Sequence, residues 1–158
     1  MDGLFRNYWA MRRYVLSITG ELNEEEVRAI PEGAVNSILW NLGHVITDEV
    51  NMLYTPSGLA SPLPDGFHGW FDPESSPRDW EPGPDVAAVR QEMQAQARRV
   101  QADYGKGRFA EFEAYSLSET YRLESAEEGI EYCALHEAMH IGVIITLIRM
   151  VTGRGVTH

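Results

Sequence analysis

The stretch SAEEGIEYCALHEAMHIGVIITLIRMVTG, residues 125–153, predicts a long helix near the C-terminal end of the chain. Ser125, followed three positions later by Glu128, forms a capping-box pattern that favours a helix start at this serine. Gly153 favours a helix end, because glycine readily adopts the left-handed conformation that terminates helices. We therefore expect one uninterrupted helix between this serine and this glycine, with the motif HEAMH near its middle.

Three segments upstream also show the features of long helices. Asn23 and Glu26 form another capping-box pattern, which predicts a short helical turn ending near Pro31. Residues 105–124 have no clear period and are compatible with one or two short strands or an irregular connection. The three long segments have apolar residues at spacings of three and four and comprise residues 3–19, 36–54 and 85–104.

A proline-rich segment separates the second and third long helices. Seven of the eight prolines lie within residues 56–84, which predicts a long loop. A loop of this length can travel the whole length of a helix, so the helices that it joins are free to run parallel. The most economical fold is an all-α four-helix bundle in one domain, residues 1–158, with this long connection between helices two and three.

Composition and charge exclude several classes of protein. The chain has 13 Lys and Arg against 24 Asp and Glu, and a net charge of −11 would repel a phosphate backbone, so we expect no nucleic-acid partner. We also expect no membrane partner, because no uninterrupted apolar run reaches the roughly 18–20 residues of a membrane span. Cys133 is the only cysteine, which excludes an internal disulfide, and the N-terminus lacks the pattern of a secretory signal. A cytoplasmic location is the expectation.

The motif HEAMH suggests a metal site. Positions i and i+4 of a helix lie about 40° apart around its axis, so His136 and His140 can bind one ion. A catalytic zinc site usually has three protein ligands, and the third has to come from elsewhere in the chain. His158 is the last residue and His68 lies in the proline-rich loop, whereas His44 lies near the middle of the second long helix. His44, His136 and His140 are therefore the predicted metal ligands.

Three further residues near these histidines have two interpretations each. Glu137 is a candidate catalytic residue, as a general base or as a partner of a metal ligand, or else an ordinary helix glutamate facing solvent. Asp48, one turn after His44, either accepts the N–H of that imidazole or is a plain surface carboxylate. Cys133 lies on the same helical stripe as His136, either as a ligand or redox-sensitive neighbour or as part of the core.

Two segments together resemble a known family. SILWNLGHVITDE, residues 37–49, and LHEAMHIGVIITLIRMVTG, residues 135–153, are similar to the DinB/YfiT-like superfamily of small metal-binding four-helix bundles. The shared pattern is a mid-helix histidine after a Trp-containing turn, followed far downstream by H-x-x-x-H and a glycine. Many relatives have Arg and then Gly-Gln after the last histidine, whereas this chain has residues 141–143, Ile-Gly-Val.

The resemblance has implications for fold, ligands and chemistry. It implies that His44, His136 and His140 hold a divalent metal in an up-down-down-up bundle, and that the protein is a homodimer. Members of the superfamily are associated with thiol-dependent transferase, isomerase and hydrolase-type reactions, so a low-molecular-weight thiol is a possible second cofactor. Three imidazoles and water suit Zn²⁺, Ni²⁺ or Fe²⁺.

Three functional hypotheses follow. The leading one is a metal-dependent hydrolase or thiol S-transferase that acts on a small molecule. A zinc peptidase of the H-E-x-x-H type is the second, although a downstream ligand and strands that could hold a peptide are both missing from the predicted elements. The third is a metal-binding or interaction module without catalytic activity.

Overall fold

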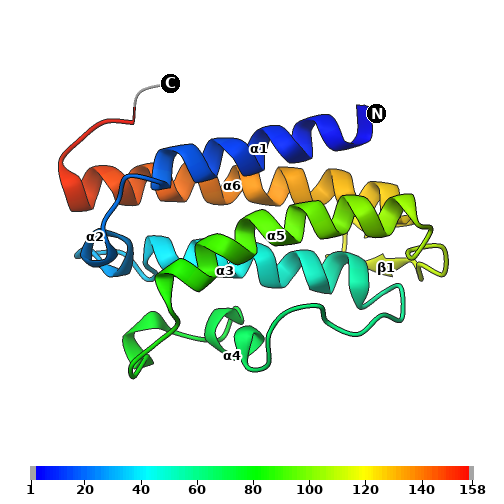
Figure 1. Ribbon diagram of the computed structural model, residues 1–158, viewed down its shortest axis with the longest axis horizontal. Coiled ribbons are helices and arrows are strands. Elements are labelled where there is room, and N and C mark those ends of the chain that lie inside the picture. Colours follow the sequence, from blue (N-terminus) through cyan, green and yellow to red (C-terminus); the bar gives the residue numbers. More distant parts are fainter. Residues whose placement is uncertain (1–2, 157–158) are drawn as a thin grey trace.

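The computed structural model describes residues 3–156, and the chain is mostly helical, as predicted. The described part contains four long helices, one short helix after the first of them and a second short helix within the proline-rich segment (Figure 1). The long helices are α1 (Gly3–Thr19), α3 (Ile38–Glu49), α5 (Val86–Gly105) and α6 (Ala126–Thr152), and the short ones are α2 (Glu24–Arg28) and α4 (Phe67–Phe71).

Each long helix packs against two of the others. Helix α1 contacts α5 and α6, and α3 contacts the same two helices from the other side. Figure 1 shows α3 and α5 running in one direction and α1 and α6 in the opposite direction. The apolar faces of these helices meet in a single buried cluster, which includes Tyr8, Leu39, Ile46, Met93 and Ile144. Burial of this apolar surface is the main favourable contribution to folding.

Side-chain caps explain where the helices begin. Ser37 accepts a hydrogen bond from the backbone N–H of Trp40, so α3 begins just after this residue and two residues later than expected. Ser125 accepts from the backbone N–H of Glu128, as its capping box predicts. The carboxylate of Glu128 accepts from the backbone N–H of Glu124, one residue before the cap. Both capping-box interactions of Asn23 and Glu26 are present at the start of α2.

The C-terminal part of the predicted second helix has a wider turn than expected. Residues Val50–Tyr54 form a π-helical turn, η1, directly after α3.

Asp85 caps α5 by accepting hydrogen bonds from the backbone N–H groups of Ala87 and Ala88. Helix α6 ends at Gly153, which has a φ of 68°, a conformation that favours glycine.

The proline-rich segment is not an unbroken loop. It contains α4 and a 3₁₀ turn, η2 (Pro77–Asp79), and it returns alongside α3 before α5 begins (Figure 1). Phe71 at the end of α4 is fully buried, and its ring lies against Gly43 of α3. A Cβ atom at residue 43 would lie 2.3 Å from this ring, so only glycine permits this contact. Aromatic anchors therefore fix the segment on α3.

The segment between α5 and α6 contains a small antiparallel hairpin. Strands β1 (Tyr115–Ser116) and β2 (Arg122–Leu123) pair Tyr115 with Leu123. Tyr121, just before β2, lies with its ring centroid 5.2 Å from that of Tyr132 in α6. The hairpin thus covers one side of α6 near its N-terminal half.

Helix α6 is the one helix among residues 3–156 that is long and apolar enough to cross a membrane by length and composition. The core helices of soluble proteins often meet the same criterion, so this observation is weak evidence for a span. Helix α6 packs against both α1 and α3 and carries Glu137 in a buried ion pair with α1. The absence of a membrane partner stays a prediction.

Candidate metal centre

The fold brings His44 of α3 together with His136 and His140 of α6. One ring nitrogen from each of these side chains lies within 4.8 Å of the other two. Nε2 of His136 and Nε2 of His140 are 3.2 Å apart. The ring centroid of His44 lies 5.4 Å from that of His136 and 4.9 Å from that of His140. The three histidines predicted from the sequence thus form one cluster, and their role as ligands stays a prediction.

The orientation of His44 is fixed by two contacts, one at its edge and one on its face. Its Nδ1 lies 3.0 Å from the backbone carbonyl oxygen of Phe71. A carbonyl oxygen only accepts hydrogen bonds, so Nδ1 carries the proton and Nε2 of the neutral ring presents a lone pair. Trp40 stacks on the ring, with centroids 4.5 Å apart and an angle of 10° between the planes. Gly43 makes this arrangement possible, because it allows Phe71 to approach α3.

Asn41 fixes His140 in the same way. Its Nδ2 donates to the backbone carbonyl of Ser37 at 2.8 Å, which identifies the other amide atom as the oxygen. That oxygen lies 2.8 Å from Nδ1 of His140, so Nδ1 donates and Nε2 again presents a lone pair. Hydrogen bonds of this kind orient histidine ligands and raise their basicity in metal sites.

Burial keeps the two histidines of α6 neutral. Loss of solvent and, to a smaller extent, the nearby His44 together lower the pKa of His136 to about 4. Loss of solvent likewise lowers the pKa of His140 to about 3, with His136 and His44 as further causes. Neutral imidazoles with converging lone pairs are the form that binds a metal ion. The donor set therefore fits a divalent transition metal.

Asp48 lies directly beside two of the three imidazoles. Its Oδ2 is 3.4 Å from Nε2 of His44 and 3.4 Å from Nε2 of His136. The sequence suggested that Asp48 accepts the N–H of His44, which would require a proton on Nε2. The contact with Phe71 places that proton on Nδ1, so this interpretation does not fit. Asp48 is also not a plain surface carboxylate, because its side chain is only 19% exposed.

Glu137 has a different environment from the one that its motif suggests. Its Oε1 accepts a hydrogen bond from Nε of Arg12 at 2.8 Å, and both side chains are about 1% exposed. Burial raises the pKa of Glu137, while the charge of Arg12 and its hydrogen bond oppose this shift. Among residues 3–156, no hydrogen bond or ion pair joins Glu137 to His44, His136 or His140. The structure therefore brings the predicted catalytic glutamate to α1 instead of to the histidines.

Arg12 connects Glu137 to a larger polar cluster in the core. Its Nη2 atom lies 3.2 Å from Oε2 of Glu49 in α3. Its Nη1 atom donates to the carbonyl oxygen of Met93 in α5 at 2.6 Å. Tyr8 donates a short hydrogen bond to the other carboxylate oxygen of Glu49. One guanidinium thus binds groups from the other three long helices.

The remaining candidates lie outside the cluster. Cys133 is buried in the core, with Sγ 3.9 Å from Sδ of Met52, and burial raises the pKa of its thiol. His68 lies in α4, where its Nε2 is 3.0 Å from Oγ of Ser61. His158 lies outside the described residues.

Sequence reasoning missed four groups that organise this region. Asn41 and Arg12 are polar residues within otherwise apolar helix faces, and such positions are a signal for a buried partner. No sequence signal identifies the Phe71 carbonyl, because a backbone acceptor is the same at every residue. Tyr132 was also missed, and its ring lies nearly parallel to that of His136 with centroids 6.5 Å apart.

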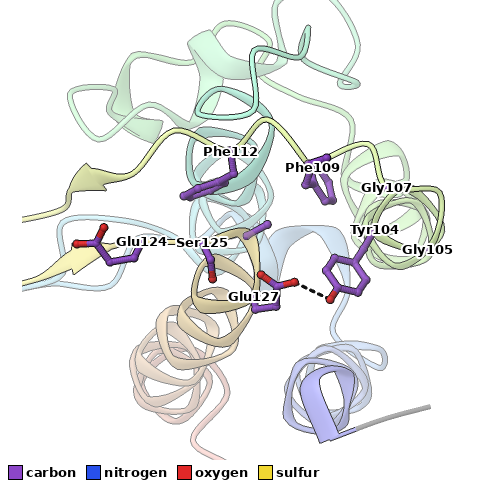
Figure 2. Close-up of a pocket in the computed structure, with 10 residues that line it drawn as sticks. Tyr104, Gly105, Gly107, Phe109, Phe112, Glu124, Ser125 and Glu127 are labelled. Atoms are coloured by element: carbon purple, nitrogen blue, oxygen red, sulfur yellow. Dashed lines mark hydrogen bonds between the residues drawn. The ribbon is translucent and has the colours of Figure 1, made fainter.

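A sizeable hollow of the described surface lies away from the histidines. It has a volume of about 610 Å³ and lies between the end of α5 and the start of α6 (Figure 2). Phe109 and Phe112 line it, and Figure 2 shows Tyr104 directing its hydroxyl at the carboxylate of Glu127, 2.7 Å away. None of the three histidines is among its lining residues, so this hollow is separate from the candidate metal centre.

Comparison with known proteins supports the resemblance seen in the sequence. No curated protein matches the chain. The family model described as the DinB superfamily matches residues 8–144, a range that contains His44, His136 and His140. Because this match covers most of the chain, the protein belongs to the DinB superfamily.

Proposed function

We propose that this protein is a metal-dependent enzyme that acts on a small molecule, with His44, His136 and His140 as the metal ligands. The observation that carries the proposal is the convergence of one ring nitrogen from each of the three histidines. Nδ1 of His44 and Nδ1 of His140 each donate to an oxygen atom, which leaves Nε2 of each ring for the metal. Such an arrangement stores lone-pair repulsion unless a cation or proton lies between the nitrogens. The proposal includes a single-domain four-helix bundle of up-down-down-up topology.

A divalent ion in this site would supply a Lewis acid that polarises a carbonyl, activates water or binds a thiolate. Burial keeps His136 and His140 neutral, and the chain's own groups bring a nitrogen of each of the three imidazoles to one point. Phe71 and Asn41 hold the Nδ1 protons of His44 and His140, and Trp40 covers the face of His44. Tyr132 borders His136, and Tyr121 of the hairpin segment lies against Tyr132, so the two rings would limit access from that side.

The position of Glu137 favours this proposal over a peptidase of the H-E-x-x-H type. In such peptidases the glutamate acts as general base on a water at the zinc ion. Glu137 is instead held by Arg12 inside the core. A hydrolase or thiol S-transferase that uses other groups near the metal therefore agrees better with the geometry, and a low-molecular-weight thiol is the proposed co-substrate for the transferase.

The proposal places the protein in the cytoplasm as a homodimer. Leu135, Met139 and Val143 of α6 are 59%, 56% and 48% exposed and form an apolar strip on its outer face. Antiparallel pairing of two α6 helices centred near residue 140 would place the exposed Glu131 of one copy opposite the exposed Arg149 of the other. A second copy of the chain is therefore the occupant that we propose for this strip.

Elemental analysis of tag-free protein tests the metal assignment, because a polyhistidine tag would itself bind metal. We expect about one transition-metal ion per chain, largely lost in His44→Ala. His68→Ala is the matched control and should retain the ion, because His68 lies outside the cluster. Retention of the metal by His44→Ala would contradict the ligand assignment, and absence of metal from all three proteins after reloading would favour a non-catalytic module.

Turnover of small molecules tests the enzymatic part. The metal-loaded protein should convert members of a panel of small esters, amides and electrophiles, the last with several thiols as co-substrates. His44→Ala should abolish this turnover and His68→Ala should not. A metal-loaded protein that turns over none of them would favour a binding module.

A further inference from the structure

We propose that Asp48 is a fourth protein ligand of the same metal, which makes the site a closed set of three nitrogens and one oxygen. The inference rests on the proposed three-histidine site and adds to it the geometry, charge and metal preference. Its starting observation is that Oδ2 of Asp48 lies beside Nε2 of both His44 and His136, on the side where the lone pairs converge.

The separations fit tetrahedral coordination. Metal–ligand bonds of about 2.0–2.1 Å at tetrahedral angles separate neighbouring ligand atoms by about 3.3–3.4 Å. The two contacts of Asp48 Oδ2, with His44 and His136, are both 3.4 Å, and the contact between His136 and His140 is 3.2 Å. Three edges of the expected tetrahedron are therefore present at nearly their final lengths.

The other carboxylate oxygen has a separate role. Oδ1 of Asp48 lies 3.4 Å from Nδ2 of Asn51, and this contact turns Oδ2 toward the histidines. Among residues 3–156, no Lys or Arg forms an ion pair with Asp48. Its negative charge thus faces the imidazole rings without a Lys or Arg partner, an arrangement that a divalent cation would compensate.

A role as an outer partner of a metal ligand does not fit the same contacts. Such a partner accepts a hydrogen bond from the ring nitrogen that does not bind the metal. For His44 that nitrogen is Nδ1, which Phe71 already occupies, and Asp48 faces Nε2. The carboxylate would therefore compete with the metal for Nε2, unless the carboxylate and Nε2 bind the same ion.

Four protein ligands would favour some metals over others. Zn²⁺ accepts tetrahedral nitrogen and oxygen ligands readily, whereas Ni²⁺ with such ligands prefers square-planar or octahedral arrangements. The inference therefore favours Zn²⁺ over Ni²⁺. A substrate would gain access to the ion by displacing the carboxylate of Asp48, whose side chain is 19% exposed, against 7% for His44 and 12% for His136.

Cobalt(II) substitution tests the inference through a spectrum and an affinity, independently of activity. Four-coordinate cobalt absorbs visible light strongly, whereas five- and six-coordinate cobalt absorbs weakly. We expect a strong spectrum for the native chain, and shifted absorption bands with at least about a 10-fold lower affinity for Asp48→Asn, because water or an amide would replace the carboxylate at the ion. Asp65→Asn, the same change at an exposed loop position, is the control and should match the native chain.

Asp48→Cys provides a positive signal. If position 48 lies in the coordination sphere, this variant should gain a sulfur-to-cobalt charge-transfer band in the near ultraviolet. The native chain should lack the band, because Cys133 is buried beside Met52. Circular dichroism of each variant verifies that it folds.

The outcomes separate the inference from the proposal on which it rests. Tight cobalt binding that is lost in His44→Ala, with a spectrum unchanged in Asp48→Asn and no new band in Asp48→Cys, would overturn the role of Asp48 alone. Failure of the native chain to bind cobalt would overturn both. A spectral change in both Asp48 variants, and not in Asp65→Asn, would establish the fourth ligand.

Discussion

The side chain of Arg12 lies 2.8 Å from that of Glu137, and this buried ion pair joins the first long helix to the last. Glu137 is the residue after His136, so one turn of α6 serves two different purposes. One face carries the histidine cluster, and the next position enters the polar core between the helices. The motif HEAMH thus combines two histidines of the cluster with a glutamate that Arg12 holds in the core.

Removal of the arginine should strongly destabilise the protein. Arg12→Met should lower the free energy of unfolding by about 3–5 kcal/mol, because Glu49 and Glu137 would both remain buried without their cation. Urea unfolding of the metal-free protein measures this change. Arg13→Met, at the neighbouring exposed position, is the control. A loss for Arg12→Met no larger than that of the control would contradict the structural role of the ion pair.

Glu137→Gln separates the two interpretations of the glutamate. Because Glu137 contacts Arg12 and not the histidines, this variant should retain its metal and any turnover while its unfolding midpoint changes. Metal analysis, a turnover assay and urea unfolding on the same preparation give the three values. Loss of turnover with unchanged stability would restore Glu137 as a catalytic base.

Gly43→Ala should weaken metal binding from outside the cluster. The added Cβ would meet the ring of Phe71 at 2.3 Å and displace its carbonyl from Nδ1 of His44. Loss of such a partner typically lowers metal affinity by about 10–100-fold. Gly142→Ala is the matched control, since nothing lies within 4 Å of its added Cβ. Equal affinities of these two variants, measured by competition with a chelator, would show that Phe71 does not support the site.

Acid should destabilise the metal-free protein through the histidines. The pKa values of about 4 for His136 and about 3 for His140 lie below the value of about 6.5 for an exposed histidine. The unfolded chain therefore binds more protons than the folded one as the pH falls below about 6.5, and stability declines in that direction. Urea midpoints at about pH 7 and about pH 5 should differ less in His140→Asn than in the native chain. An identical pH dependence in both would contradict the low pKa of His140.

Val143→Glu should convert the proposed homodimer into a monomer. The substitution places a charge in the exposed apolar strip of α6, where two copies would exclude water. Val35→Glu, at another exposed valine far from this strip in the sequence, should leave the molar mass in solution unchanged. Sedimentation equilibrium measures the mass. A native chain that is already monomeric would contradict the dimer.

The local sequence predicts most of the helical segments. Capping residues such as Ser125 and Asp85 and the terminal Gly153 act over a few neighbouring residues, so their effect can be read from the chain. The predicted element boundaries were wrong where contacts between distant parts of the chain determine the local structure. The short helix α4 within the proline-rich segment depends on packing of Phe71 against Gly43, which lies in another element.

For the candidate site, the sequence by itself determined that His136 and His140 share one face of a helix, because helical geometry places i and i+4 together. Only the tertiary structure decided that His44 and Asp48 join them and that Glu137 faces Arg12 instead. Adjacent helix residues point about 100° apart, and whether each meets a metal site or the core depends on which neighbouring helix lies there. That choice is made by the packing of α1, α3 and α6, which no local pattern encodes.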